Sequence, residues 1–168
     1  MSISVLRTGA AILMAVLVIN GGAAVTASTF IKLDIPALSK ESESVVHARV
    51  VGMRSDWNAD HSMIFTHVRL RVIRGLTGAP PAEMTVRVPG GSVGDLTTEM
   101  VGGPRFAMND EVVAFVSRWD DGVPAVMGYG QGLSHVRRDA AGRRVLRGGA
   151  ADGMTIGELA MRLGRPGR

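Results

Sequence analysis

The segment Met63–Arg74 restricts the fold more than any other part of the chain, because apolar and polar side chains alternate along it. The alternation is carried by three apolar and three polar residues, namely Val68, Leu70 and Val72 against His67, Arg69 and Arg71. A period of two places successive side chains on opposite faces of a strand and does not fit the helical period. The segment therefore predicts an antiparallel strand with one face on a core and the other in water.

Other segments predict further strands at intervals of roughly ten residues. Val45–Met53 is rich in β-branched residues and forms a predicted hairpin with the alternating segment, while Val112–Val116 is a continuous apolar run typical of a buried strand. The remaining candidates are Met84–Val88 ending at Pro89-Gly90-Gly91, Leu96–Met100, Pro124–Tyr129, Leu133–Arg137 and Arg144–Arg147. Such a succession of short strands and turns indicates one mainly β domain, a barrel or a sandwich.

Short helices are predicted at both ends of the strand region. Pro36 stands near the first turn of a candidate helix at Ile35–Glu43. Near the C-terminus, Thr155 and Glu158 have the spacing of a capping box. An apolar stripe follows, and Gly164 stands where a C-terminal cap belongs. We therefore expect a C-terminal helix over residues 155–164.

The first 27 residues have the features of a secretory signal peptide. Arg7 supplies the positive charge, Gly9–Ile19 is apolar, and Val25-Thr26-Ala27 offers small residues for cleavage before Ser28. The apolar run is shorter than the roughly 20 residues that span a bilayer. We expect cleavage, an exported protein in the periplasm or outside the cell, and one domain over residues 28–168. An uncleaved anchor is the alternative.

Composition excludes several classes of function. The chain has no cysteine, so thiolate metal sites, cysteine nucleophiles and lipid attachment at a cysteine are ruled out. Its net charge of +4 belongs to the arginine-rich C-terminal part, whereas residues 28–136 hold more acidic than basic side chains. That tail has no aromatic residue for stacking on bases, so we predict no nucleic-acid partner.

The sequence shows no marked catalytic site and no need for a cofactor. Its histidines do not form the HExxH pattern of a helical zinc site. Asp56, Asp60 and His61 share one polar turn and are weak candidates for metal ligands, because a single flexible loop is poorly preorganised. The segment Arg87–Asp95 lacks the GK[ST] ending of a phosphate loop and is interpreted as a structural turn.

Two loops carry the residues that best fit a protein-binding role. Trp57 lies in the predicted hairpin tip at Ser55–Ser62, where it either anchors a partner or caps the end of the barrel. The second loop is the Gly-containing segment Ser92–Arg105. The candidate partner-binding residues are Trp57, Asn58, Asp60 and His61 in the first loop, and Ser92, Asp95 and Arg105 in the second. Loops at one end of a rigid barrel are a common place for such contacts.

The order of short motifs along residues 30–163 resembles an uncharacterised family of exported bacterial proteins. The motifs are Val45–Val50, Ile64–Thr66, Ile73–Leu76, Val86–Gly91, Gly103–Phe106, Glu111–Val116 and Val126–Gly128. More distantly, the layout is similar to the netrin-like module of tissue inhibitors of metalloproteinases, an OB-like barrel that binds other proteins. That resemblance implies an OB-like barrel of about five strands, and together with the strand pattern above we expect an OB-like antiparallel barrel of about five to seven strands. Those inhibitors reach the protease zinc through an N-terminal cysteine, which this chain lacks, so their chelating mechanism is not implied.

Taken together, these features predict an exported, non-enzymatic module that binds another extracytoplasmic protein, with a secreted protease as one candidate partner. Two alternatives remain at this point. One is a small hydrolase assisted by a metal at Asp56, Asp60 and His61. The other is a structural envelope component that holds acidic polymers through the segment Arg137–Arg147.

Overall fold

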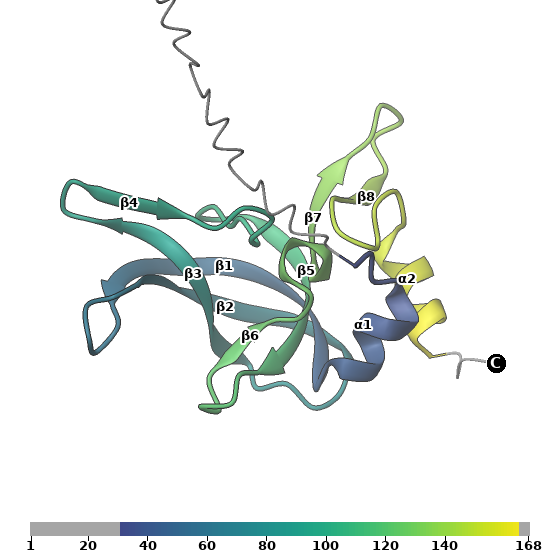
Figure 1. Ribbon diagram of the computed structural model, residues 1–168. Helices are drawn as coiled ribbons and strands as arrows, with labels where there is room; N and C mark the ends of the chain where they lie inside the picture. The colour runs from purple at the N-terminus through teal and green to yellow at the C-terminus, as the bar shows by residue number, and fades with distance from the viewer. Residues whose placement is uncertain (1–30, 165–168) are drawn as a thin grey trace, which may run out of the picture. The chain divides into compact units, whose positions relative to one another are not determined.

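Strands dominate the part of the chain that the computed structural model describes, residues 31–164 (Figure 1). The strands are β1 (Ser44–Trp57), β2 (Ile64–Thr77), β3 (Glu83–Val93), β4 (Leu96–Glu99), β5 (Glu111–Arg118), β6 (Pro124–Val126), β7 (Leu133–Arg138) and β8 (Arg144–Arg147). The helices are α1 (Ile35–Glu41) and α2 (Ile156–Leu163). The mainly β class and both short helices are confirmed. The signal-peptide prediction for Met1–Ala27 lies outside the described residues, and neither helix within them is long and apolar enough to cross a membrane.

The strands form one antiparallel sheet in the order β4-β3-β2-β1-β5-β7-β8, with β6 paired to the other half of β5. The alternating segment is β2, and it forms the predicted hairpin with β1 from Val45↔Thr77 to Trp57↔Ile64. Eight strands replace the five to seven expected. Each of the eight overlaps one of the eight candidate segments, and a 3₁₀ turn at Tyr129–Gly132 separates β6 from β7. Within residues 31–164, backbone pairing does not close the sheet, and the OB-like barrel stays a prediction.

Two hydrophobic cores lie on opposite faces of the central strands. The inner core is lined by the concave face of the sheet and consists of Val46, Ala48, Val50, Val68, Leu70, Val86, Val88, Val112, Ala114, Val116, Val126 and Leu133. The outer core lies between the sheet and the two helices and consists of Ile35, Leu38, Val45, Val113, Phe115, Val136, Leu146, Ala151 and Leu159. The helices thus cover only part of the outer face of the sheet (Figure 1).

The strand β5 contributes to both cores, which explains its unbroken apolar sequence. Successive side chains of a strand point to opposite faces. Val112, Ala114 and Val116 therefore enter the inner core, while Val113 and Phe115 enter the outer core. All five are buried.

Both helices begin with side-chain caps, of which the sequence analysis predicted the one at α2. The Asp34 carboxylate accepts a hydrogen bond of 2.9 Å from the Ala37 amide at the start of α1. At α2, Thr155 and Glu158 form both bonds of the predicted capping box. Gly164 ends α2 at the expected position but keeps a right-handed backbone, with φ of −76°. Its cap therefore does not use the left-handed conformation that glycine allows.

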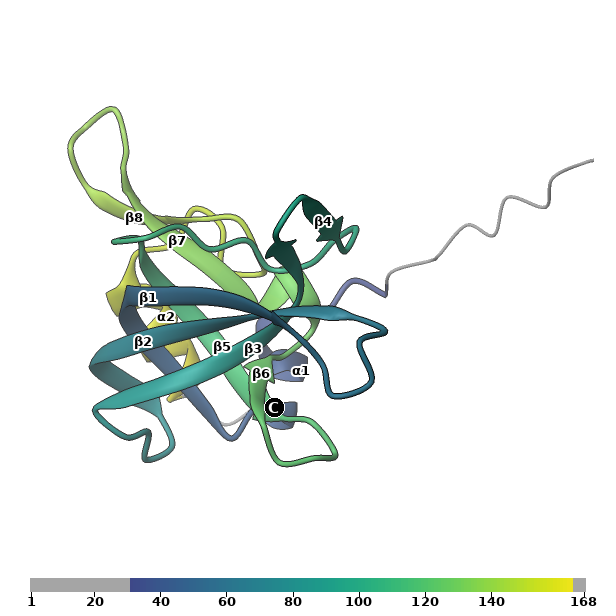
Figure 2. The ribbon, with the colours of Figure 1, turned by 90° about the vertical axis from the view of Figure 1, so that its left-hand side faces the viewer.

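Side chains bridge the gap where backbone pairing is missing. The strands β3 and β6 lie side by side (Figures 1 and 2) without pairing to each other. Arg87 of β3 packs against two aromatic rings that contact each other, 4.3 Å from the Trp119 centroid and 4.9 Å from the Phe65 centroid. It also forms an ion pair with Asp121 in the turn before β6. We call Arg87, Phe65, Trp119 and Asp121 the seam cluster.

Truncation of Phe115 tests whether the two cores depend on β5. Phe115→Ala is expected to lower the free energy of unfolding by about 3–5 kcal/mol, because it leaves a cavity under the helices. Phe115→Leu retains most of the volume and should cost less than about 1.5 kcal/mol. Val101→Ala is the control, since Val101 is 84% exposed. Urea unfolding measures all three, and equal midpoints for Phe115→Ala and the control would contradict the two-core arrangement.

Removal of Arg87 tests the seam cluster. Arg87→Ala is expected to cost about 1–2 kcal/mol of unfolding free energy, because a largely buried guanidinium loses two aromatic partners. Arg105→Ala removes an arginine whose side chain is 81% exposed and should change stability by less than about 0.5 kcal/mol. A double-mutant cycle with Trp119→Ala measures the coupling. If the effects of the two substitutions on the unfolding free energy were additive, the contact between Arg87 and the Trp119 ring would contribute nothing to stability.

Candidate functional site

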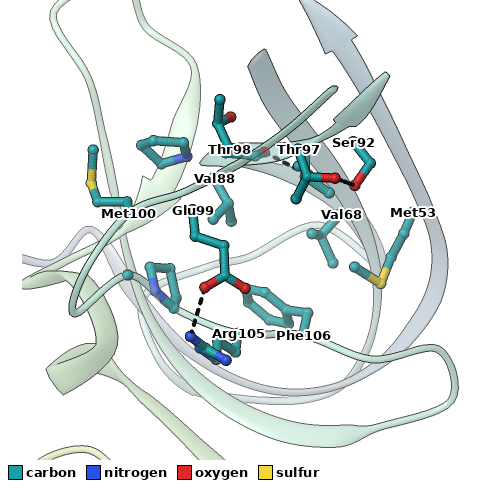
Figure 3. A pocket seen from close by; sticks show the side chains of 16 residues that line it. Met53, Val68, Val88, Ser92, Thr97, Thr98, Glu99, Met100, Arg105 and Phe106 are labelled. Atoms are coloured by element: carbon teal, nitrogen blue, oxygen red, sulfur yellow. Dashed lines mark hydrogen bonds and ion pairs between the residues drawn. The ribbon is translucent and has the colours of Figure 1, made fainter. Parts of the chain in front are cut away.

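A cleft of about 330 Å³ opens between the β3–β4 hairpin and the segment 100–106 (Figure 3). Apolar side chains from the core strands and from the segment form its floor, namely Met53, Val68, Val88 and Phe106. Polar side chains line its rim, namely Ser92, Thr97, Thr98, Glu99 and Arg105. An apolar floor with a few polar groups around it is the usual composition of a binding site.

Two glycines in β3 create the cleft. The strand pairs with β2 only as far as Phe65↔Pro89, and from Gly90↔Glu99 onward it pairs with β4 instead. Gly91 has a φ of +136°, and a Cβ there would lie 2.3 Å from the Thr66 hydroxyl oxygen. Only glycine fits this turn of the backbone. The sequence predicted a strand end at Pro89-Gly90-Gly91, which is wrong, because the strand bends there and continues to Val93.

The rim of the cleft is held by contacts that a ligand can displace. The Ser92 and Thr97 hydroxyl groups lie 2.8 Å apart. Arg105 and Glu99 form an ion pair of 3.2 Å (Figure 3), with side chains 81% and 70% exposed. Exposed ion pairs contribute little to stability. The arrangement therefore allows Arg105 and Glu99 to exchange partners at small cost.

The cleft adjoins the free edge of the sheet. The strand β4 ends the sheet order, and within residues 31–164 its outer edge pairs with no strand. All four of its residues are exposed, and Leu96 has 59% of its surface in solvent. An edge strand presents unpaired backbone donors and acceptors, which can pair with an added strand.

The structure brings together two of the three candidate residues in the second predicted loop. Ser92 and Arg105 line the cleft. Asp95 lies in the exposed turn between β3 and β4, outside the cleft lining. The binding role of all three stays a prediction.

The first predicted loop forms a separate group at the tip of the β1–β2 hairpin. The rings of Trp57 and His61 are stacked, with centroids 5.8 Å apart and an angle of 12° between their planes. Trp57 is half-buried. The Asn58 side chain accepts a hydrogen bond of 2.9 Å from the Met63 amide, which closes the turn. None of these residues lines the cleft.

The three weak candidates for metal ligands have other partners. Asp56 binds Arg54 at 2.5 Å, and His61 is stacked on Trp57. Asp60 accepts bonds from the Ser62 hydroxyl and amide groups, and these bonds lower its pKa. Across residues 31–164, no three histidine or acidic side chains converge in a way that could hold a metal ion.

A cluster of charges that the sequence analysis missed surrounds Glu111 at the start of β5. His47 Nε2 of β1 lies 2.5 Å from Glu111 Oε1, and Arg144 of β8 binds the same oxygen. Arg49 approaches the other oxygen at 3.6 Å. Burial raises the pKa of Glu111, but the hydrogen bond from His47 and the charge of Arg144 outweigh it and hold the pKa below its ordinary value.

The neighbouring Asp110 binds a different set of partners. Its carboxylate lies 3.1 Å from His135 Nδ1 and 2.9 Å from an Arg137 nitrogen. Asp110 and Glu111 are adjacent in the sequence, but their side chains contact different histidines and arginines. No spacing in the sequence indicates which histidine or arginine each of them contacts.

Comparison with known proteins returns no match, since no family model, no curated protein and no solved structure is similar to this chain. The candidate sites are therefore assigned from their own geometry.

Acid titration tests the Glu111 cluster. Because folding lowers the pKa of Glu111 from 4.5, its contribution to stability is present above that pH and is lost as the pH falls through the folded value. Glu111→Gln should therefore cost about 1–2 kcal/mol at pH 7, and the difference from the parent protein should shrink in acid. Glu41→Gln is the control, as Glu41 is exposed on α1. If the difference in unfolding free energy between Glu111→Gln and the parent protein stayed constant with pH, it would contradict the lowered pKa of Glu111.

Proposed function

We propose that this protein is an exported, non-enzymatic module that binds another extracytoplasmic protein. The observation that supports this best is the cleft beside the free edge of β4. Its apolar floor, polar rim and adjacent strand edge are the features that receive an extended segment of a partner. A secreted protease is a candidate partner.

The size and openness of the cleft favour a protein segment over a small molecule. Small-molecule sites occupy about 300–1,000 Å³ and enclose most of the ligand. This cleft of about 330 Å³ lies at the lower limit, and its rim residues are exposed. It has room for one or two side chains, while the rest of the segment would lie along β4.

The hairpin tip is proposed as a second contact. Trp57 is partly exposed, and its stacking on His61 holds the ring in one orientation. A fixed aromatic ring loses little conformational entropy on binding, which is why tryptophan is frequent among the residues that dominate interfaces. Trp57, Asn58, Asp60 and His61 are the residues proposed for this contact.

Partner capture tests the proposal. Residues 28–168 serve as bait in secreted and envelope fractions, and affinity for a saturable partner is then measured by titration calorimetry. Ser92→Trp should weaken binding at least about fivefold, because the indole fills the cleft. Ala140→Trp, in the exposed turn between β7 and β8, is the matched control and should bind normally.

Trp57→Ala should cost more than about 1 kcal/mol of binding free energy and leave the melting temperature nearly unchanged.

Two results would contradict the proposal. One is an empty capture at both low and high salt. The other is a partner whose affinity is unchanged by Ser92→Trp and by Trp57→Ala. A large fall in melting temperature for Trp57→Ala would assign the residue to packing and leave the cleft as the only proposed contact.

A further inference from the structure

The part of the outer sheet face that the helices leave open carries several arginines. Arg69 and Arg71 come from β2, Arg49 from β1 and Arg144 from β8, and all are exposed. We call these four residues the arginine face. Arg49, Arg69 and Arg71 lie on the exposed side of β1 and β2, whose other side contributes to the inner core.

The register of the strands places like charges next to each other. Arg49 and Arg71 are directly opposite in the β1–β2 pairing. Like charges in this position destabilise a sheet. Arg69 of β2 is paired with Gly52 of β1. A Cβ added to Gly52 would lie 3.3 Å from the Arg69 Nε atom. The glycine therefore leaves space for a third guanidinium on the same surface.

Acidic partners are too few to neutralise this face. Glu83 binds Arg71 at 3.0 Å, and Glu111 is shared between Arg49 and Arg144. Within residues 31–164, Arg69 forms no ion pair with an acidic side chain. Four positive charges thus face two carboxylates.

We propose that the arginine face binds an extended acidic segment of a partner protein, with carboxylates at every second position. Arg69 and Arg71 are two residues apart on one strand, so their side chains repeat at about 6.6–6.8 Å. Alternate side chains of an extended peptide repeat at the same distance. Each guanidinium can bind a carboxylate through two parallel hydrogen bonds.

The chemistry of the face favours this occupant over other anions. None of its four residues is aromatic, whereas single-stranded nucleic acids bind on surfaces that stack bases on aromatic rings. Ile73, two residues from Arg71 on β2, is an exposed apolar side chain beside the face, but surfaces that insert at a membrane interface carry a whole apolar face rather than one such residue. The proposal does not depend on the cleft, which lies at a different edge of the sheet, beside β4.

Two synthetic peptides of the same composition test the spacing. One alternates glutamate with serine, and the other holds all glutamates in one block. Fluorescence anisotropy with the full chain should show tighter binding of the alternating peptide, and binding should weaken as salt is added. Arg69→Gln combined with Arg71→Gln should weaken it about tenfold, since two charge contacts are lost. Arg162→Gln, an exposed arginine on α2, should not change it.

Several outcomes would overturn the proposal. They are equal affinity for both peptides, binding of neither, and stronger binding to dextran sulfate or to vesicles of anionic lipid than to the alternating peptide.

Stability gives an independent check, because a binding residue without an acidic partner should be dispensable for folding. Arg69→Gln is therefore expected to leave the melting temperature unchanged or raised, and a fall of several degrees would assign Arg69 to packing.

Discussion

The burial of β5 and of the first residues of β1 on both faces is the constraint on which the rest of the structure depends. These two neighbouring strands contribute valines to the inner core, while Val45 and Phe115 enter the outer core. Because side chains alternate along a strand, a single apolar strand contributes side chains to both hydrophobic cores. The helices need only cover part of the outer face. The part of the outer face that the helices leave uncovered can hold charged side chains. The Glu111 cluster and the arginine face occupy that area.

The candidate cleft results from how the sheet ends. A sheet with an edge exposes backbone groups that proteins usually cover, shorten or charge. Here the bend at Gly90 and Gly91 turns the last hairpin away from β2, so that its edge lies beside apolar side chains of the inner core. The seam cluster holds the other side of β3 without backbone pairing. The floor of the cleft is thus rigid and its rim is exposed, an arrangement suited to binding without large rearrangement.

The sequence could predict features that depend on neighbouring residues. The alternation in β2, the apolar run in β5 and the capping box at Thr155 are local patterns, and the structure contains each of them. Features that depend on distant contacts were missed. Glycines at 90 and 91 fit a turn as well as a bend, and neighbours from other strands, the Thr66 and Ser55 hydroxyls, decide between them. The partners of Glu111 and Arg87 likewise come from other strands and turns, so no spacing in the sequence indicates them.

The pairing of β1 with β5 also has a consequence for how the chain acquires its structure. His47 and Glu111 meet across these strands although they are 64 residues apart in the sequence. Contacts between such distant segments form late, because the intervening loop must first be closed. A chain that emerges with its N-terminus first therefore has no complete core until β5 has followed. Until then the hairpin of β1 and β2 leaves the apolar side chains of both cores uncovered, so these two strands reach their final packing only after the residues of β5 have been added.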